Sequence, residues 1–358
     1  MKAILMLEDG KSFTGEALGV QGERIGRVFF DTAVVGYQEM LTDPANAGKI
    51  LVLTYPLIGN YGCAPKFNES KKAWLSGLVI KENSRIYSNW QAKQSFDGFI
   101  KEHNLLVIRG VDTRTLAVHI RNNGEMIGII STVSLNAKEL LAKIEKFRKK
   151  QEKSLLPEIS VKKPVILGKA GAKRIAILDL GINQSVINQL ERLGLSIEVF
   201  PYKASFDQIL KIKPKGLIVS GGPEDDPGLE EVVGCLRNLI KRLPILGIAT
   251  GYQVLARALG AKVVKMKVGH HGVNYPICSP GSLKGEITTQ NHSYAVDPGS
   301  LKKIKHIDIS AVNLNDNSIE EIESKKLKLI GAQYSPVSPG FNEANAVFKK
   351  FIKMLSKE

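Results

Sequence analysis

The stretch that decides the fold is Pro244-Ile245-Leu246-Gly247-Ile248-Ala249-Thr250-Gly251-Tyr252-Gln253-Val254-Leu255-Ala256. Its apolar start, its closely spaced glycines and its apolar-periodic end predict a buried strand that turns sharply into a helix. In α/β enzymes the apex of such a corner presents a nucleophile, and the helix N-terminus behind it stabilises developing negative charge. The apex here is Ala249, whose methyl group cannot attack a carbonyl. The stretch therefore predicts the architecture of covalent catalysis without its nucleophile.

Strands and helices are predicted to alternate on both sides of this corner, from Arg174 onward. Expected strands cover 174–178, 196–200, 216–220 and 245–248, and expected helices cover 185–193, 206–212, 229–241 and 251–259. This spacing predicts a parallel sheet covered by helices on both faces. Ligands bind at the carboxyl ends of such strands, where Asp179-Leu180-Gly181, Ser220-Gly221-Gly222-Pro223 and Ala249 fall. A more antiparallel part follows through 285–289, 307–312 and 329–333, and a helix over 344–355 ends the chain.

Residues 1–150 predict an α/β domain of their own. Glu8-Asp9-Gly10 has the composition of a tight hairpin turn, and Ser95 and Asp112 are expected to cap helices. A lysine-rich helix is expected over 135–150. Residues 151–173 lose this periodicity and contain two prolines and two glycines, which predicts a linker. The expected domains are therefore 1–150 and 174–358.

Composition limits the function classes. With 43% hydrophobic and 24% charged residues, the chain is typical of globular proteins, and it lacks both a long apolar stretch and a signal-type start. Cys63, Cys235 and Cys278 form no metal-ligand spacing, so we expect reduced thiols, no metal and a cytoplasmic location. The net charge of +15 is spread along the chain without aromatic interleaving. It favours solvated basic faces or an acidic protein partner over nucleic acid, and no membrane contact is expected.

The stretch 244–256 resembles the nucleophile-elbow motif of the triad-type, class I glutamine amidotransferases. Its continuation, Gly260-Ala261-Lys262-Val263-Val264-Lys265-Met266-Lys267-Val268-Gly269-His270-His271-Gly272-Val273-Asn274-Tyr275-Pro276, narrows the resemblance to the carbamoyl-phosphate synthase small-chain family. Segments 36–44, 53–62 and 110–116 resemble the N-terminal domain that only this small chain carries. The resemblance implies an N-terminal α/β domain and a flavodoxin-like, mostly parallel amidotransferase domain. It also implies that the N-terminal domain docks against a large synthetase chain.

The resemblance further implies which residues occupy the catalytic positions. A glutaminase of this family needs a Cys thiolate, a His base, a Glu that orients the His, and backbone N–H donors for the oxyanion. Ala249 stands at the Cys position. In Gln333-Tyr334-Ser335-Pro336-Val337-Ser338-Pro339-Gly340, Ser335 stands at the His position and Val337 at the Glu position, with one residue deleted after it. The whole proton relay is therefore expected to be absent.

The glutamine-binding positions are only partly preserved in this resemblance. Gly222 is retained, but Glu224 stands where the family has a glycine whose N–H serves the oxyanion, and a carboxylate there has the wrong charge. Three further positions are replaced: Ala45 stands for Ser, Thr250 for Leu and Tyr252 for His. Gln253 and Asn291 are retained, and His292-Ser293-Tyr294 is a version of the family's His-Gly-Phe. Glutamine binding is therefore doubtful.

These expectations describe a small subunit with an inactive glutaminase site, in a heterodimer with the carbamoyl-phosphate synthase large chain. No cofactor is expected in this chain, whereas ATP and Mg²⁺ are expected on the large chain. The complex would use free ammonia to supply pyrimidine and arginine synthesis. Two alternatives stay open. The first is an active glutaminase using unrecognised residues, such as Cys278 with His270, His271 or His292; the second is a non-catalytic binding protein without a large chain.

Overall fold

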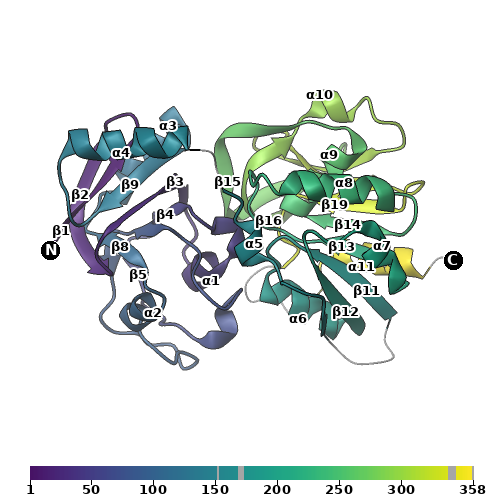
Figure 1. The fold of residues 1–358 in the computed structure, drawn as a ribbon, viewed down its shortest axis with the longest axis horizontal. Helices are drawn as coiled ribbons and strands as arrows, with labels where there is room; N and C mark the ends of the chain where they lie inside the picture. Colours follow the sequence, from purple (N-terminus) through teal and green to yellow (C-terminus); the bar gives the residue numbers. More distant parts are fainter. Residues whose placement is uncertain (151–152, 168–172, 338–343, 357–358) are drawn as a thin grey trace. The chain divides into compact units, whose positions relative to one another are not determined.

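The computed structural model describes residues 1–150, 153–167, 173–337 and 344–356. The chain divides into an N-terminal unit, Met1–Glu152 with Lys267–His271, and a C-terminal unit, Lys153–Met266 with Gly272–Glu358. Each unit mixes helices and strands (Figure 1), which confirms the predicted α/β class. No helix in the described residues is both long enough and apolar enough to cross a membrane.

The N-terminal unit is built on a closed barrel with the strand order β1-β2-β8-β6-β4-β3-β9. Its strands are β1 (Lys2–Leu7), β2 (Ser12–Gly19), β3 (Glu23–Asp31), β4 (Ile50–Leu53), β6 (Gly77–Val79), β8 (Leu106–Arg109) and β9 (Met126–Ser131). The predicted hairpin forms, since β1 and β2 pair antiparallel up to Met6 and Ser12, and Gly10 in the turn has a φ of 88°. A positive φ is accessible to glycine at little cost, so the turn residue suits the turn.

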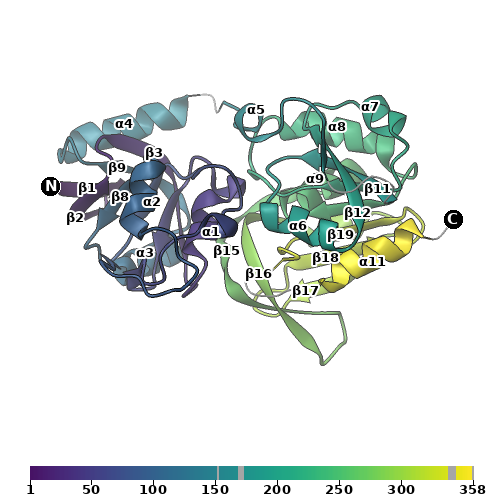
Figure 2. The same ribbon diagram turned by 90° about the horizontal axis from the view of Figure 1, so that it is seen from below.

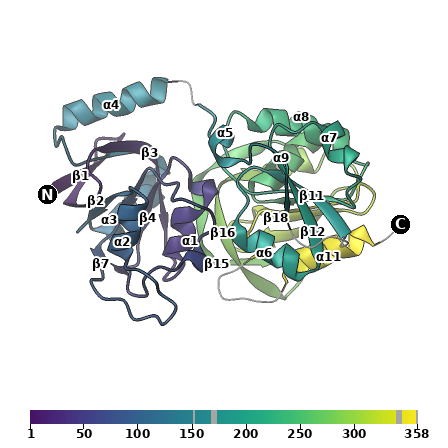
Figure 3. The same cartoon turned by 60° about the horizontal axis from the view of Figure 1, so that its bottom comes forward.

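Short helices and one small ribbon surround this barrel. They are α1 (Tyr37–Thr42), α2 (Phe96–Glu102), α3 (Thr113–Asn123), α4 (Ala137–Lys149), the 3₁₀ turns η1 (Pro44–Asn46) and η2 (Pro65–Phe67), and the paired strands β5 (Leu57–Ile58) and β7 (Glu82–Asn83). Both predicted caps are present: Ser95 accepts from the Gly98 N–H at 3.1 Å, and Asp112 accepts from the Thr115 N–H at 3.0 Å. Helix α4 packs its buried Leu140 and Ile144 against residues of β1 and β9. Figure 3 shows this helix near β1.

The segment Lys267–His271 belongs to the N-terminal unit through Glu125. The Gly269 N–H donates to Glu125 Oε1 at 2.8 Å, and His271 Nε2 lies 3.1 Å from the same oxygen. Both side chains are buried, so their pairing satisfies polar groups that would be costly to leave alone. A fragment that ends near residue 150 would therefore lack partners that Glu125 has in the full chain.

The C-terminal unit contains a sheet with the order β10-β12-β11-β13-β14-β19-β18-β17-β15-β16. Its strands are β10 (Val165–Leu167), β11 (Lys173–Asp179), β12 (Leu195–Pro201), β13 (Leu217–Val219), β14 (Ile245–Ile248), β15 (Val263–Cys278), β16 (Gly285–Val296), β17 (Asp308–Asn313), β18 (Ile319–Ser324) and β19 (Leu329–Ala332). The neighbouring strands β12, β11, β13, β14 and β19 run parallel to one another. Next to them, β18 and β17 continue the sheet with antiparallel pairing. This arrangement confirms a parallel core with an antiparallel extension. The expectation that 329–333 belongs to the antiparallel part is wrong, because β19 pairs parallel with β14 and is antiparallel only towards β18.

Helices cover both faces of the parallel part of this sheet. They are α5 (Leu156–Ile159), α6 (Gln184–Arg192), α7 (Phe206–Lys211), α8 (Leu229–Leu239), α9 (Thr250–Leu259), α10 (Pro298–Leu301) and α11 (Ala346–Leu355). One hydrophobic core joins α8 and α9 to the sheet, and a second joins α6 and α11 to its other side (Figure 2). Each helix buries one apolar face, as the sequence periodicity predicts.

The segment expected as a linker contains regular structure in its described part. Within 153–167, residues Leu156–Ile159 form α5, and β10 pairs antiparallel with the edge of β12. Asp226 accepts from the Leu155 N–H at 2.5 Å and so holds the start of α5. The short apolar run Val165-Ile166-Leu167 gains order by adding to an exposed sheet edge, a contact that local periodicity does not reveal. Residues 168–172 of the expected linker lie outside the described residues.

Candidate functional site

The corner between β14 and α9 keeps the backbone geometry of a nucleophile elbow. Ala249 has a φ of 49° and a ψ of −116°, an uncommon conformation for a residue with a Cβ. Its N–H donates to the Ala332 carbonyl at 2.7 Å, and its carbonyl accepts from the Gln253 N–H at 3.1 Å. Backbone strain of this kind persists only where the surrounding structure enforces it. The elbow is therefore present although its apex carries only a methyl group.

Two glycines make this elbow sterically possible. A Cβ on Gly251 would lie 2.1 Å from the Val219 carbonyl oxygen, at the end of the neighbouring strand β13. A Cβ on Gly247 would lie 2.8 Å from the Gly251 carbonyl oxygen. The first turn of α9 can approach the sheet this closely only because both positions lack a side chain.

Replacing Gly251 with alanine should therefore unfold the elbow. The new methyl group would meet backbone that cannot rotate away, so we expect a loss of about 3 kcal/mol or more in the free energy of unfolding. Such a loss corresponds to a fall of roughly 6–12 °C in melting temperature. Thermal unfolding followed by circular dichroism measures it. Gly234→Ala is the matched control, because Gly234 lies inside α8 with no atom within 4 Å of its added Cβ. It should stabilise by about 0.5–1 kcal/mol, and equal effects of the two changes would contradict the steric account.

The segments predicted at the carboxyl ends of the strands lie together around the elbow. The Leu180 N–H donates to Ser220 Oγ at 2.9 Å, and Thr250 Oγ1 donates to the Gly222 carbonyl at 2.6 Å. A Cβ added to Gly221 would lie 3.6 Å from the Ala249 Cβ, so the glycine backbone faces the apex directly. These contacts build the frame of a site at the edge where parallel sheets bind ligands.

The two residues predicted at the base and carboxylate positions, Ser335 and Val337, form local contacts. Ser335 Oγ donates to the Val337 carbonyl at 2.8 Å, and the Ser335 N–H donates to the Thr289 carbonyl at 2.9 Å. Val337 and Ala249 both pack against the same hydrophobic cluster, which includes Ile248. No thiol, imidazole or carboxylate therefore stands at these three positions. The rest of that motif, Ser338-Pro339-Gly340, lies outside the described residues.

Glu224 is the centre of a buried polar network. Its Oε1 accepts from Gln253 Nε2 at 2.7 Å and from the Tyr294 N–H at 3.2 Å, and its Oε2 accepts from the Ser293 N–H at 2.7 Å. Gln253 Nε2 also lies 3.1 Å from the Tyr294 carbonyl and 3.3 Å from Gln333 Oε1. From the sequence, Glu224 is expected only to disfavour an oxyanion through its negative charge. The structure adds that the carboxylate binds the Ser293 and Tyr294 amides of β16.

The other predicted pocket positions differ in their surroundings. Asn291 lies half-buried in β16, two residues before Ser293. Ala45 belongs to the 3₁₀ turn η1 of the N-terminal unit, where its N–H donates to Asp43 Oδ1 at 2.9 Å. Tyr252, at the family's His position in the elbow, is buried, and its hydroxyl lies 3.3 Å from the Ile319 carbonyl. It therefore serves as a core residue of α9.

Cys63 and Cys235 are not activated thiols. Burial raises the pKa of the Cys63 thiol to about 12 and the pKa of the Cys235 thiol to about 11. Since the thiolate is the nucleophile, both groups are unreactive at neutral pH. Cys278 pairs with Val312 where β15 meets β17, and among the described residues it forms no hydrogen bond to a histidine. These observations weaken the hypothesis of a relocated Cys–His pair.

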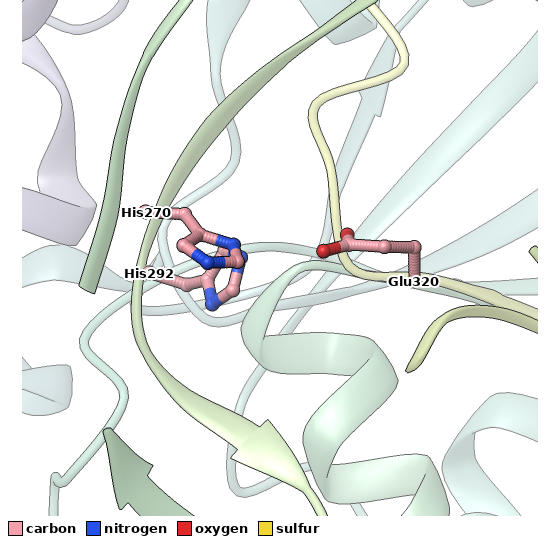
Figure 4. A group of neighbouring side chains, drawn as sticks. All are labelled: His270, His292 and Glu320. Carbon is pink, nitrogen blue, oxygen red and sulfur yellow. The ribbon is translucent and has the colours of Figure 1, made fainter. Parts of the chain in front are cut away.

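Figure 4 shows a group that sequence spacing did not reveal, His270, His292 and Glu320. All three are buried, and their possible ligand atoms lie within 4.8 Å of one another. Imidazole and carboxylate are common zinc ligands. Both ring nitrogens of His292 already lie 2.9 Å from hydrogen-bond partners, the Tyr294 carbonyl and Gln290 Oε1. A metal would have to displace one of them, and the expectation of no metal stays a prediction.

Two family models match the chain, one in each of its two parts. The family model "Carbamoyl-phosphate synthase small chain, CPSase domain" matches residues 5–130, and "Glutamine amidotransferase class-I" matches residues 176–354. The chain is 37% identical to the carbamoyl phosphate synthase small chain of Syntrophotalea carbinolica, over 100% of this chain and 98% of that protein. It is 38% identical to the same-named protein of Aquifex aeolicus, over 98% of each. A crystal structure of a glutamine amidotransferase from Thermotoga maritima is 17% identical, with a TM-score of 0.36, over 50% of this chain and 80% of that chain.

Proposed function

Since the chain belongs to the carbamoyl-phosphate synthase small-chain family, we propose that it is a small subunit that no longer hydrolyses glutamine. In this proposal it supports a large chain that makes carbamoyl phosphate from bicarbonate, ATP and free ammonia, with ATP and Mg²⁺ bound on the large chain. The product would enter pyrimidine and arginine synthesis. The observation that carries the proposal is the chemistry at Ala249, Ser335 and Val337, the positions of the nucleophile, base and orienting carboxylate.

The surroundings of these positions support the loss of hydrolysis. Glutamine hydrolysis needs a thiolate that attacks the amide carbon and a base that moves protons between the thiol and the leaving ammonia. The Ala249 methyl group has no electron pair to donate, and Ser335 Oγ already donates its proton to a backbone carbonyl. Val337 and Ala249 pack on an apolar cluster, which disfavours any charged intermediate beside them.

Glutamate release is the direct test of this proposal. The full chain, alone and with a large chain, should release no glutamate from glutamine above the rate of the buffer. Release that depends on the chain, and is lost on heating it, would overturn the proposal.

We also propose that the N-terminal unit docks on the large chain through the loop 84–93. Ile86 and Trp90 in this loop have exposed fractions of 79% and 88%, and Tyr87 is also exposed. Segment 53–62, which resembles part of the family's N-terminal domain, holds the loop. The Ser84 N–H donates to the Ile58 carbonyl at 2.7 Å, and the Ser88 N–H donates to the Asn60 carbonyl at 3.2 Å. Large apolar side chains on a hydrogen-bonded loop suit a protein interface, in which buried aromatic residues contribute most of the affinity.

Trp90→Ala in the full chain should weaken binding to the large chain about tenfold to thirtyfold. Truncating a tryptophan at the centre of an interface commonly costs about 2 kcal/mol. The dissociation constant can be measured by biolayer interferometry with immobilised large chain. Leu283→Ala is the control, because Leu283 is a fully exposed apolar residue of the C-terminal unit. If Leu283→Ala weakens binding while Trp90→Ala does not, the docking surface lies on the C-terminal unit instead.

A further inference from the structure

We propose that the Ser293 and Tyr294 amides and the Gln253 side chain form a carboxylate-binding site that this chain fills with its own Glu224. The ligand class of the site is a carboxylate, and the ligand is covalently part of the protein. This inference goes beyond the proposed function, because the absence of a triad does not require that the pocket be occupied.

The donors around Glu224 have the arrangement of an anion site. Two successive backbone N–H groups, of Ser293 and Tyr294, donate to the two oxygens of one carboxylate at 2.7 and 3.2 Å. Successive N–H groups of a regular strand point in opposite directions, whereas converging ones form a concave site for an anion. Gln253 Nε2 adds a third donor at 2.7 Å. Distances near 2.7 Å are typical of charge-assisted hydrogen bonds.

The site is built from buried groups that have hydrogen-bonding capacity to spare. Glu224, Gln253 and Ser293 are all more than nine-tenths buried. Gln253 Oε1 and Gln333 Nε2 are also buried, and neither atom has a hydrogen-bond partner among the described residues. A buried polar atom without a partner costs about 1–3 kcal/mol. Gln253 Oε1 is an acceptor, which an acceptor-only carboxylate cannot satisfy, so the present occupant, Glu224, leaves part of the hydrogen-bonding capacity of these side chains unused.

Glu224 reaches the site from the turn that precedes α8. It is followed by the exposed Asp225 and by Asp226, which binds the start of α5, so the backbone on its C-terminal side is held in place. A group tethered in this way has an effective concentration on the order of millimolar or higher. Free carboxylates at lower concentrations would therefore compete poorly with Glu224 for the Ser293 and Tyr294 amides. The site would then not bind the carboxylate of an amino acid. That consequence adds a second obstacle to glutamine, independent of the missing thiol.

The test uses the full chain alone, with acetate as the probe and chloride at equal ionic strength as the reference. Glu224→Ala should open the site, so that acetate at several times its dissociation constant raises the melting temperature by about 2 °C or more. The wild type should show no such rise. Hydrogen exchange at the Ser293 and Tyr294 amides gives a local measure: it should become at least about tenfold faster in Glu224→Ala and slow again with acetate.

Two further variants make the outcome decisive. Glu231→Ala removes an exposed carboxylate of α8 that pairs with Lys203 rather than with Ser293 or Tyr294, and it should show neither the acetate response nor the faster exchange. Glu224→Gln keeps the side chain in the site but presents an –NH₂ group to one N–H donor. It should speed exchange of at least one of the two amides, and acetate should not reverse this.

The proposal is overturned if folded Glu224→Ala does not respond to acetate, or if acetate stabilises the wild type equally. Should Glu224→Ala fail to fold, unchanged exchange at both amides in Glu224→Gln would overturn it instead. No glutamine and no large chain enter these measurements, so their failure leaves the proposed loss of glutaminase activity untouched.

Discussion

The complex of this chain with its large chain is expected to make carbamoyl phosphate from ammonium and to make none detectable from glutamine. Removing the nucleophile alone from a hydrolase triad lowers turnover on the order of 10⁶-fold, and removing further triad members adds little because they act as a unit. Ala249 and Ser335 supply neither a thiolate nor an imidazole. The ammonium reaction does not use the elbow, so it should be unaffected by these residues.

The measurement is carbamoyl phosphate formation by one preparation of the complex with each nitrogen donor in turn. The matched control replaces this chain with the small chain of Aquifex aeolicus, to which it is 38% identical, on the same large chain. If that control uses glutamine and the present complex does not, the difference belongs to the small chain. Glutamine-dependent turnover close to the ammonium rate, or a trapped glutamyl thioester on this chain, would contradict the prediction.

Ala249→Cys alone is expected to leave the chain inert towards glutamine. A cysteine at the elbow would have a pKa near its ordinary value of about 8.5 unless the N-terminus of α9 lowers it, and no base is in place to take its proton. Ser335 is hydrogen-bonded to Val337 within its own turn. Glu224, which binds the Ser293 and Tyr294 amides, would also oppose the carboxylate of a bound glutamine.

The smallest repair with a chance of activity therefore changes several positions together. It combines Ala249→Cys, Glu224→Gly, Ser335→His and Val337→Glu with one residue inserted after Val337, because loop length there sets where the imidazole points. Glutamate release should be measured for the single, the stepwise and the combined variants, and every step short of the full set should remain inactive. Appreciable hydrolysis by Ala249→Cys alone would mean that a working base already exists, with His270, His271 and His292 as the first candidates.

Much of the fold could be predicted because its signals are local. The Ser95 and Asp112 caps each bind an N–H three residues ahead, so the residue and its partner can be read together. The alternation of strands and helices after Arg174 predicts a parallel sheet for the same reason, since each period lies within one segment. The elbow followed from the spacing of Gly247, Ala249 and Gly251, whereas the missing triad rests on residue identity alone and stays a prediction.

The sequence by itself therefore determined the α/β class, the elbow and the alanine at its apex. Only the tertiary structure decided that Glu224 binds amides 69 and 70 residues further along the chain. It also decided that Lys267–His271 joins the N-terminal unit, and that Val165–Leu167 extends a sheet within the expected linker. Caps and periodicity depend on neighbours along the chain, whereas these contacts join segments far apart in sequence. They depend on which partner satisfies a buried polar group or a free strand edge once the chain has folded.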